Sequence, residues 1–395
     1  MKVQRTIPPA AATLDWADLW YGVLGSLAGQ STIDRFEGEL REYFGVRYVY
    51  AVSSGKAALA VILGALTSLS SRREVVIPAY TCFSVPSAIC KTNLTVRLCD
   101  VDQRTFDFDY SLLEKVVSDR TLCVVPNHLF GIPSDLDRLR TVCEPRGIYV
   151  IEDAAQAMGG SYKGRKLGTI GDAGFFSFGR GKNITCGSGG IIVTNSSSIS
   201  SMIEKNYTTL DRSSVYGSLK ELIVLLFAKV FIHPWLYWFP AGLPFLGLGE
   251  TIFYADFPVK RFSGFKAGLM RRWKAHLEES NRARISNGRY FMREVTEDTP
   301  AQNGEPYLRF PILAKNRESR DRLFAFSQKK GVGLSTMYPT PICEIPEIRS
   351  AFVGERFPSA TDIAARILTI PTHTLVIERD RSAIMKLLNS SRGFE

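Results

Sequence analysis

The sequence lacks the cysteine patterns of disulfide-stabilised and zinc-binding proteins. It has seven cysteines, an odd number, and no CxxC pair, so neither a disulfide framework nor a zinc site is indicated and we expect no metal. Residues 1–16 also have no apolar core behind their basic residues, which argues against a secretory signal. Together these absences favour a reducing, cytoplasmic environment.

Signatures of nucleic-acid binding are missing as well. The sequence contains no zinc finger, basic zipper or RNA-binding motif, and we find no internal repeat or low-complexity tract. Lysine and arginine nevertheless outnumber aspartate and glutamate, giving a formal net charge of +10 and a pI near 9.2. A solvated basic surface explains this charge, and phosphorylated or nucleotide-linked substrates or an anionic membrane would also suit it. We expect no nucleic-acid partner.

The chain does contain a long alternation of predicted strands and helices. It has 395 residues, of which 45% are hydrophobic and 22% charged, enough for a large core and a second domain. Short β-rich runs predict strands at 48–52, 74–78, 94–99, 122–126, 148–152, 174–178 and 191–194. Helical patterns between several of them predict an α/β domain with a mostly parallel sheet, whose sites gather at the carboxyl ends of the strands.

Three parts are expected along the chain. Residues 1–210 hold an N-terminal arm and the large α/β domain, residues 211–274 hold an apolar insertion, and residues 275–395 form a smaller α+β domain. The last part has predicted helices at 275–295 and 317–330, a predicted strand at 307–313 and a final helix near 380–388.

Residues 150–190 carry the most specific chemical signal. An apolar strand ends at Asp153, and about thirty residues later a second apolar segment ends near Lys182, which lies among several glycines. Pyridoxal phosphate needs such a pair, because a lysine holds it as a Schiff base and a carboxylate keeps its ring nitrogen protonated. Taken alone, Asp153 could cap a helix and Lys182 could be a surface lysine, so the order of the two is what carries the signal.

A turn upstream could hold the cofactor's phosphate. The segment VSSGKAAL ends a strand and begins a helix, whose first N–H groups attract anions. Gly55 lets a phosphate approach the backbone, and Lys56 could add a positive charge. Ser-Ser-Gly before a helix is more often only an N-cap. Gln156 lies one helical turn after Asp153 and could donate to the cofactor's phenolic oxygen.

The order of SSGKAAL, IPAYTC, VIEDAAQA, GDAGFFSF, GKN and SGGIIVTN resembles the DegT-type sugar aminotransferases. The resemblance covers about residues 25–210 and 275–390, and it implies a fold-type-I transferase dependent on pyridoxal phosphate, with a seven-stranded sheet. It further implies transfer of an amino group from a donor such as glutamate to a nucleotide- or lipid-linked keto-sugar, in amino-sugar or envelope-glycan biosynthesis. A homodimer with shared active sites is expected.

The resemblance assigns roles to six residues. Lys182 would hold the cofactor and move the proton, and Asp153 would keep the cofactor ring charged. Gln156 would contact the ring, and the phosphate would bind to Gly55, Lys56 and Ser177.

Other readings stay open. A related subgroup dehydrates sugars and carries histidine in place of the lysine, so Lys182 favours transamination. A non-catalytic binding or regulatory protein is a third interpretation, because several positions depart from the family pattern. Lys56 stands where threonine is frequent, Cys82 where an aromatic residue stacks on the cofactor, and Met158 and Met337 where histidine is common. Tyr80 or Phe83 could compensate for Cys82.

Residues 222–249 are almost uninterruptedly apolar, with Lys229 as the only full charge. Their length permits a membrane span, but Pro234, Pro240 and Pro244 oppose one straight helix. Tryptophan and tyrosine in this segment, with a basic cluster downstream, suit a membrane interface. We therefore expect either peripheral contact with a membrane, at the inner face of the cell membrane, or burial of this segment against protein.

Overall fold

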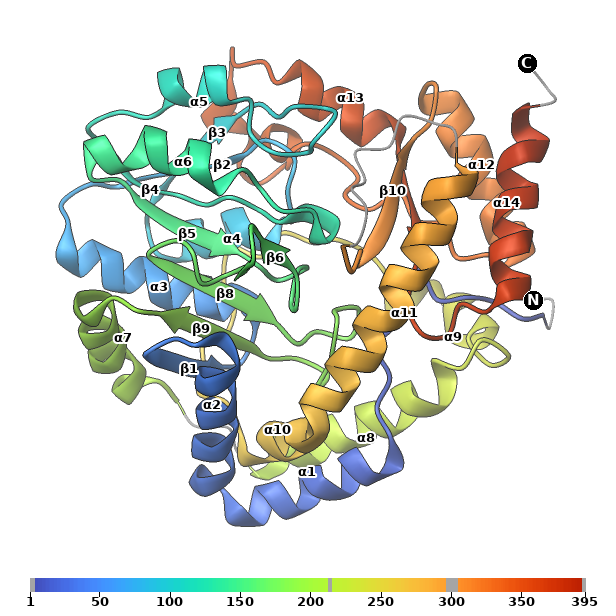
Figure 1. Cartoon of the computed structure of the whole chain (residues 1–395), viewed down its shortest axis with the longest axis horizontal. Helices are drawn as coiled ribbons and strands as arrows, with labels where there is room; N and C mark the ends of the chain where they lie inside the picture. Colours follow the sequence, from blue (N-terminus) through green and yellow to red (C-terminus); the bar gives the residue numbers. More distant parts are fainter. Residues whose placement is uncertain (1–3, 212–214, 296–304, 393–395) are drawn as a thin grey trace.

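The computed structural model describes residues 4–211, 215–295 and 305–392, and a seven-stranded sheet lies at its centre (Figure 1). Strands β8, β5, β4, β2 and β3 are neighbours in that order and pair in parallel, whereas β9 is antiparallel to both β8 and the edge strand β1. The predicted α/β class and mostly parallel sheet are confirmed. The strands are β1 (Tyr48–Val52), β2 (Glu74–Pro78), β3 (Thr95–Cys99), β4 (Thr121–Val124), β5 (Tyr149–Asp153), β8 (Ala173–Ser177) and β9 (Gly190–Thr194).

The central strands are apolar because helices cover both of their faces. All five residues of β2 are buried. Val75 and Ile77 join the core formed with α3 (Gly55–Leu69) and α4 (Ser84–Lys91), whereas Val76 joins the core of α5 (Tyr110–Val116) and α6 (Leu136–Cys143). The alternation of side chains along a strand therefore fills two cores at once.

Further elements surround this sheet. Helix α2 (Gln30–Phe44) packs beside β1, and α7 (Ser197–Thr209) packs against α3. A short hairpin of β6 (Ser161–Tyr162) and β7 (Arg165–Lys166) turns at Lys163 and Gly164, both with positive φ. The 3-10 turns of this part are η1 (Leu129–Gly131) and η2 (Glu144–Arg146).

The C-terminal part is built on a two-stranded antiparallel sheet. Helix α11 (Trp273–Glu294) runs from the large sheet to this part (Figure 1). Strands β10 (Arg309–Leu313) and β11 (Ile367–Pro371) pair there, which confirms the strand expected at 307–313 and adds an unpredicted one. The other elements are α12 (Arg317–Lys330), η5 (Ile342–Glu344), η6 (Arg349–Phe352), α13 (Pro358–Arg366) and α14 (Glu378–Arg392).

The N-terminal arm contains a helix that the sequence analysis did not predict, α1 (Trp16–Ala28). Helix α1 crosses α10 (Gly264–Leu269) at a contact made by glycines. The 3-10 turn η4 (Met270–Arg272) follows α10. A Cβ on Gly25 would lie 2.3 Å from the carbonyl oxygen of Gly264, and one on Gly268 would lie 2.1 Å from that of Tyr21. No side chain fits at this crossing, so the backbones touch directly.

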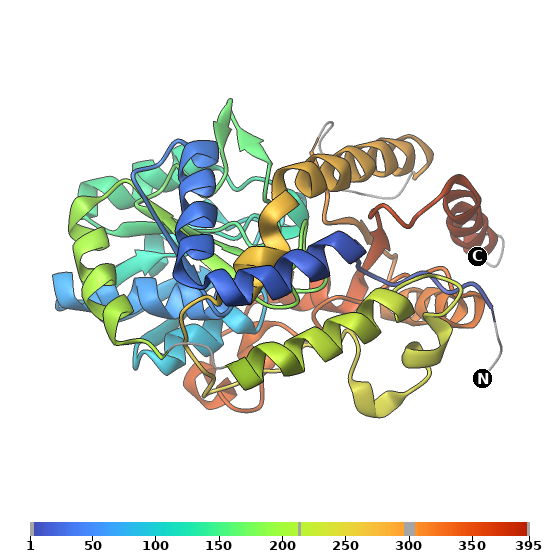
Figure 2. The same cartoon turned by 90° about the horizontal axis from the view of Figure 1, so that it is seen from below.

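The apolar insertion is folded as α8 (Val215–Phe231), α9 (Trp238–Ala241) and η3 (Pro244–Leu246). Helix α8 lies beside α1 in both views (Figures 1 and 2). Leu225 is buried, whereas Ile223, Phe227 and Val230 are exposed. Within the described residues, no helix is both long and apolar enough to traverse a bilayer.

Candidate active site

Asp153 and Ser177 are the last residues of the neighbouring strands β5 and β8, so both lie at the carboxyl edge of the sheet. Asp153 is buried, and its Oδ1 accepts a hydrogen bond from the backbone N–H of Ala155 at 3.0 Å. Burial raises the pKa of Asp153, and the positive charge of Lys182 opposes that rise. A cation beside this carboxylate would therefore be stabilised.

Lys182 lies in the glycine-rich loop after β8 and shares the site with Asp153. A Cβ on Gly179 would lie 3.8 Å from Cγ of Lys182 and 3.6 Å from Oγ of Ser177, so both side chains flank the same glycine. Burial lowers the pKa of Lys182, whereas Cys82 and Asp153 oppose that shift. A lowered pKa makes more of the neutral amine available, which is the form that attacks a carbonyl or accepts a proton.

The turn at residues 53–56 closes the site on the side of α3. Ser54 caps the helix, its Oγ accepting from the N–H of Ala57 at 3.1 Å. A Cβ on Gly55 would lie 2.9 Å from Cβ of Ser177, and one on Gly190 would lie 2.5 Å from the carbonyl oxygen of Ser54. The close approach brings the N-terminus of α3 and the Ser177 hydroxyl together, the combination expected to bind a phosphate.

Lys56 begins the same helix but points toward the insertion. Its Nζ lies 4.4 Å from the ring centroid of Tyr254 and 4.6 Å from that of Phe257. Lys56 also lines a cavity of about 490 Å³ with Cys82, Phe245 and Tyr254. The segment that follows the apolar helices therefore forms one wall of a cavity at the candidate site.

Gln156 contacts a residue whose role the sequence analysis did not predict. Its Nε2 donates to the hydroxyl of Tyr338 at 2.9 Å, and its Oε1 accepts from the N–H of Phe130 at 3.2 Å. Burial holds the pKa of Tyr338 well above 10, and Cys82 and Asp153 raise it further. The Tyr338 hydroxyl is thus protonated at neutral pH and belongs to the site, although it comes from the C-terminal part.

The departures from the family pattern have distinct positions. Cys82 interacts electrostatically with Lys56, Lys182 and Tyr338, so it lies at the site. Tyr80 and Phe83 are buried and pack against the ring of Tyr338, with centroids 5.6 and 6.4 Å away. Tyr80 and Phe83 therefore hold the ring of Tyr338 in place by packing against it. The aromatic residue beside Cys82 is then Tyr338.

The two methionines differ from one another. Met158 is buried in the core formed with α1, α2 and α10. Met337 has a φ of 58° and immediately precedes Tyr338, so its strained backbone sets the direction of that residue.

Two buried networks fix the backbone around the site. The Ser134 N–H donates to Nδ1 of His128, so Nε2 of His128 carries the hydrogen that it donates to Glu152 at 3.0 Å. Burial raises the pKa of Glu152, but hydrogen bonds from His128 and from the N–H groups of Gly168 and Gly171 outweigh it and hold the pKa below its usual value. This pair anchors the loop before β8 to the strand that ends in Asp153.

Arg284 is the second anchor. It is fully buried on α11, and its guanidinium donates to the carbonyl oxygens of Leu308 at 2.6 Å, Ala11 at 3.1 Å and Lys182 at 3.2 Å. One side chain therefore joins the N-terminal arm, the glycine-rich loop of Lys182 and the approach to β10. No local sequence pattern marks such a residue, because its partners are far apart in the chain.

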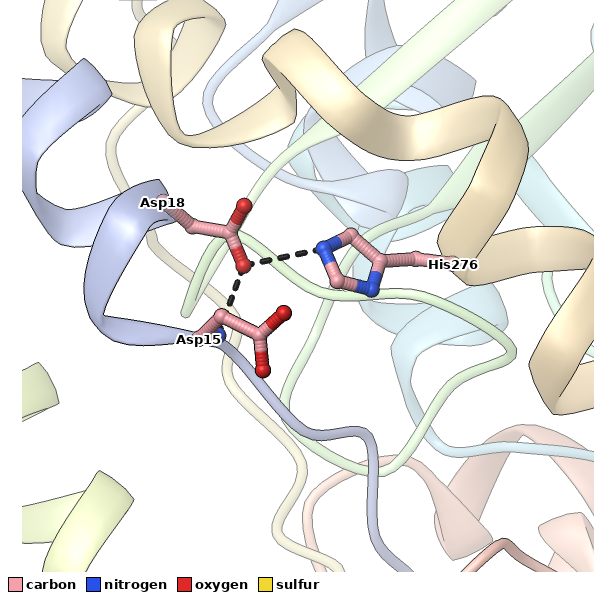
Figure 3. A group of neighbouring side chains, drawn as sticks. All are labelled: Asp15, Asp18 and His276. Carbon is pink, nitrogen blue, oxygen red and sulfur yellow. Dashed lines mark hydrogen bonds and ion pairs between the residues drawn. The ribbon is translucent and has the colours of Figure 1, made fainter.

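A group of three possible metal ligands lies away from this site (Figure 3). Asp15, Asp18 and His276 converge where α1 meets α11. Asp18 accepts from the backbone N–H of Asp15 at 2.6 Å as part of a capping box, and it forms an ion pair of 2.9 Å with His276. Nη2 of Arg272 forms an ion pair with Oδ2 of Asp15 at 2.9 Å. These contacts account for the cluster as a joint between two helices.

The order and placement of these residues correspond to one protein family. The profile of the DegT/DnrJ/EryC1/StrS aminotransferase family matches residues 24–213 and 262–389. The chain belongs to this family. The match leaves out residues 214–261, which include the apolar residues 222–249.

Named relatives and a solved structure agree with this assignment. GDP-perosamine synthase of Caulobacter vibrioides is 37% identical over 163 residues, which are 41% of this chain and 44% of that protein. The chain thus spans less than half the length of that relative. The dTDP-3-amino-3,4,6-trideoxy-alpha-D-glucose transaminase of Streptomyces venezuelae is 26% identical over 86% of this chain and 81% of that one. The structure of Helicobacter pylori PseC, an aminotransferase involved in the biosynthesis of pseudoaminic acid, superposes with a TM-score of 0.79 at 17% identity, covering 99% of this chain and all of that one.

Proposed function

We propose that this protein is a pyridoxal-phosphate-dependent aminotransferase that moves an amino group from an amino acid such as glutamate to a keto-sugar. The observation that carries the proposal is the pair of buried Asp153 and half-buried Lys182 at the carboxyl edge of the sheet, opposite the N-terminus of α3. A lone lysine or a lone helix N-terminus would not support it.

The residues at the site fit pyridoxal phosphate. The N–H groups of Gly55 and Lys56 begin a helix, and Ser177 adds a hydroxyl within the same turn, which suits a phosphate dianion. Burial raises the pKa of Asp153, so a protonated ring nitrogen would relieve the cost of its negative charge. The bound cofactor supplies an electron sink for negative charge at the carbon that carries the amino group.

The side chains of this chain supply the proton transfers. Lys182, with its lowered pKa, takes a proton from the donor's α-carbon as a base and returns a proton to the sugar carbon as an acid. Gln156 and the protonated Tyr338 form a rigid, buried wall beside Asp153, which excludes water from this side of the site. Arg284 fixes the backbone carbonyl of Lys182 so that the amine returns to the same position.

We extend the substrate class from the relatives' names, which describe a perosamine synthase and a sugar transaminase. A nucleotide- or lipid-linked keto-sugar, used in amino-sugar or envelope-glycan biosynthesis, suits the net positive charge of the chain and the apolar wall of its cavity. The dehydratase alternative is disfavoured by Lys182, because the related subgroup that dehydrates sugars has histidine in place of this lysine. A binding protein on the same fold would need no lysine of lowered pKa.

Absorption spectroscopy tests the proposal. Wild-type protein mixed with pyridoxal phosphate should develop the visible band of a lysine-bound cofactor and lose it on addition of L-glutamate. Lys182→Ala should remain folded without the band, and Lys166→Ala, which changes another partly exposed lysine, should behave as wild type. Absence of cofactor uptake by the wild type would exclude both the transaminase and the dehydratase.

We also propose that residues 222–249 rest on the cytoplasmic face of a membrane. Phe227 and Val230 of α8 and Trp16 and Trp20 of α1 are all exposed. The two helices lie side by side (Figure 2), and Nζ of Lys229 on α8 lies 5.5 Å from the ring centroid of Trp16. Exposed apolar residues gathered on adjoining helices suit contact with a partner surface. Flotation with anionic vesicles tests this, with Phe227→Ser expected to weaken binding. Wild type that remains unbound to vesicles would refute it.

The expected homodimer competes for the same surface. If a second copy covers α1 and α8, sedimentation without lipid should give a dimer that Phe227→Ser dissociates. A dimer unaffected by that substitution places its interface elsewhere. We retain shared active sites and the division at residues 210 and 275 as proposals.

A further inference from the structure

The side chain of Lys56 brings a positive charge to the cavity beside the candidate site. Its half-buried amine lies against the rings of Tyr254 and Phe257, and no ion pair joins it to another residue within 4–211, 215–295 and 305–392. Lys91 contacts the same ring of Phe257, but its amine pairs with Asp256. Burial lowers the pKa of Lys56, so an anion in the cavity would relieve the cost of its charge.

The cavity connects the candidate site with the apolar insertion. Its volume is about 490 Å³, and Cys82 lines it beside Lys56. Cys82 also interacts electrostatically with Lys182, so one residue borders both the cavity and the candidate catalytic amine. The cavity is therefore a space in which the carrier group of a sugar held at Lys182 can lie.

The wall that faces Lys56 is hydrophobic and comes from residues 245–254. Four of the side chains that line it are hydrophobic and exposed, namely Phe245, Leu246, Ile252 and Tyr254. Glu250 is the one acid among the described residues of the lining, and it is exposed, so water screens its charge. A ligand with both an anionic group and an apolar group matches this combination of walls.

The apolar surface continues outside the cavity. Phe227 and Val230 of α8 are exposed, and Figure 2 shows the segment after α8 turning back below this helix, on the same side of the molecule. Helix α8 is fixed there by Leu225, because a Cβ on Gly187, in the loop of Lys182, would lie 2.9 Å from its side chain. A nucleotide would leave the exposed side chains in water, whereas a hydrocarbon chain would cover them.

We propose that the keto-sugar is carried by a phosphorylated lipid, whose phosphate binds to Lys56 and whose hydrocarbon chain lies along residues 245–254. This choice of carrier rests on the proposed function. The side chain of Lys56 then serves the substrate, while its backbone N–H stays at the N-terminus of α3, where the cofactor's phosphate is expected. A lipid carrier would also keep the sugar on the side of the molecule that α8 turns toward a membrane.

Calorimetry with three kinds of anion tests the carrier. Farnesyl diphosphate, below the concentration at which it forms micelles, is compared with inorganic pyrophosphate and with uridine, guanosine and thymidine diphosphates, on the full-length protein saturated with pyridoxal phosphate. Farnesyl diphosphate should bind at least about tenfold more tightly than the others, because its chain buries apolar surface. Equal or tighter binding of a nucleotide, or no binding of farnesyl diphosphate, would overturn the proposal.

Variants separate the charge from the apolar wall. Lys56→Gln should weaken the binding of farnesyl diphosphate about tenfold, as expected for loss of a charged contact. Ile252→Ser should weaken it about fivefold and leave the binding of pyrophosphate unchanged. Lys91→Gln is the matched control, because the amine of Lys91 is already paired with Asp256, and it should bind as wild type does. Binding that neither Lys56→Gln nor Ile252→Ser weakens would refute the cavity as the lipid site.

Failure of the proposed function can be told apart. Absence of cofactor uptake by the wild type refutes the aminotransferase, and the same titrations on the cofactor-free protein still examine the cavity. Amino-group exchange with L-glutamate together with a preference for a nucleoside diphosphate supports the aminotransferase and rejects the lipid carrier. Unchanged urea midpoints of Lys56→Gln and Ile252→Ser show that a lost affinity does not come from unfolding.

Discussion

Replacing Arg284 by lysine should destabilise the protein far more than its conservative chemistry suggests. The guanidinium serves three backbone carbonyls from separate segments, at Ala11, Lys182 and Leu308. Nη2 contacts the carbonyls of Ala11 and Lys182, whereas Nη1 contacts that of Leu308. A lysine ammonium is a single point on a flexible stem and cannot occupy both positions. At least one of the two positions then loses its donor.

The size of the effect follows from that count. Each buried carbonyl left unsatisfied costs about 1–3 kcal/mol. The carbonyl of Leu308 keeps the Thr372 hydroxyl as a second donor at 3.1 Å, so the predicted loss of about 1–3 kcal/mol comes mainly from the carbonyls of Ala11 and Lys182. Burial and Arg309 lower the pKa of Arg284 to about 9, so the arginine is charged at pH 7 and its hydrogen bonds are of the stronger kind. Against a typical total of about 5–15 kcal/mol, this is a large fraction of the stability.

Urea unfolding of the cofactor-free protein measures this loss. Arg282→Lys is the matched control, because Arg282 is exposed on the same helix. The midpoint should fall markedly for Arg284→Lys and stay near wild type for Arg282→Lys. Equal midpoints for the two variants would show that the shared guanidinium does not hold the three segments together.

Three further predictions concern the phosphate turn and two buried titratable groups. Gly190→Ala places a Cβ 2.5 Å from a backbone carbonyl oxygen and should weaken cofactor binding by at least about tenfold. Gly64→Ala places a Cβ no closer than 3.7 Å to a neighbouring atom, so it should bind the cofactor normally and stabilise α3 by up to about 1 kcal/mol. Similar affinities in the two variants would contradict the steric argument. A hydrogen bond from the protonated ring of His276 to Asp18 raises the pKa of His276 above 6.5. The stability that this ion pair gives should therefore be complete below pH 6.5 and disappear as the pH rises through the raised pKa. Unfolding measured from about pH 6 to 9 should show this dependence in the wild type and lose it in His276→Gln. Burial raises the pKa of Glu37 to about 7, so the folded state holds this proton more tightly than the unfolded state. The free energy of unfolding should therefore fall between pH 4.5 and 7. Glu37→Gln should flatten that fall, and an unchanged slope in the variant would contradict the prediction.

The strands and the strand-end residues were predictable from the sequence because their signals are local. Short apolar runs bounded by turns gave all seven strands of the large sheet, and Asp153 and Ser177 follow such runs directly. Parallel strands place their carboxyl ends at one edge, so sequence order alone predicted that these residues would meet.

The rest of the site depends on contacts that no local pattern encodes. Tyr338, Arg284 and Arg309 reach the candidate site only because the C-terminal part packs against the large sheet. Helix α1 was missed for a different reason. Its glycines face α10 and its tryptophans face outward, so its large apolar residues do not mark the face that packs on the rest of the chain.

The shared guanidinium of Arg284 also has a consequence for protein synthesis. The backbone of Lys182 is held by a residue made 102 positions later, and Ala11 by one made 273 positions later. Domains fold in the order in which they leave the ribosome, so the large sheet can form while the loop of Lys182 still lacks its anchor. A nascent chain shorter than about 284 residues would present a cofactor cradle without a fixed lysine. Secure loading of the cofactor would therefore require a chain synthesised at least as far as Arg284.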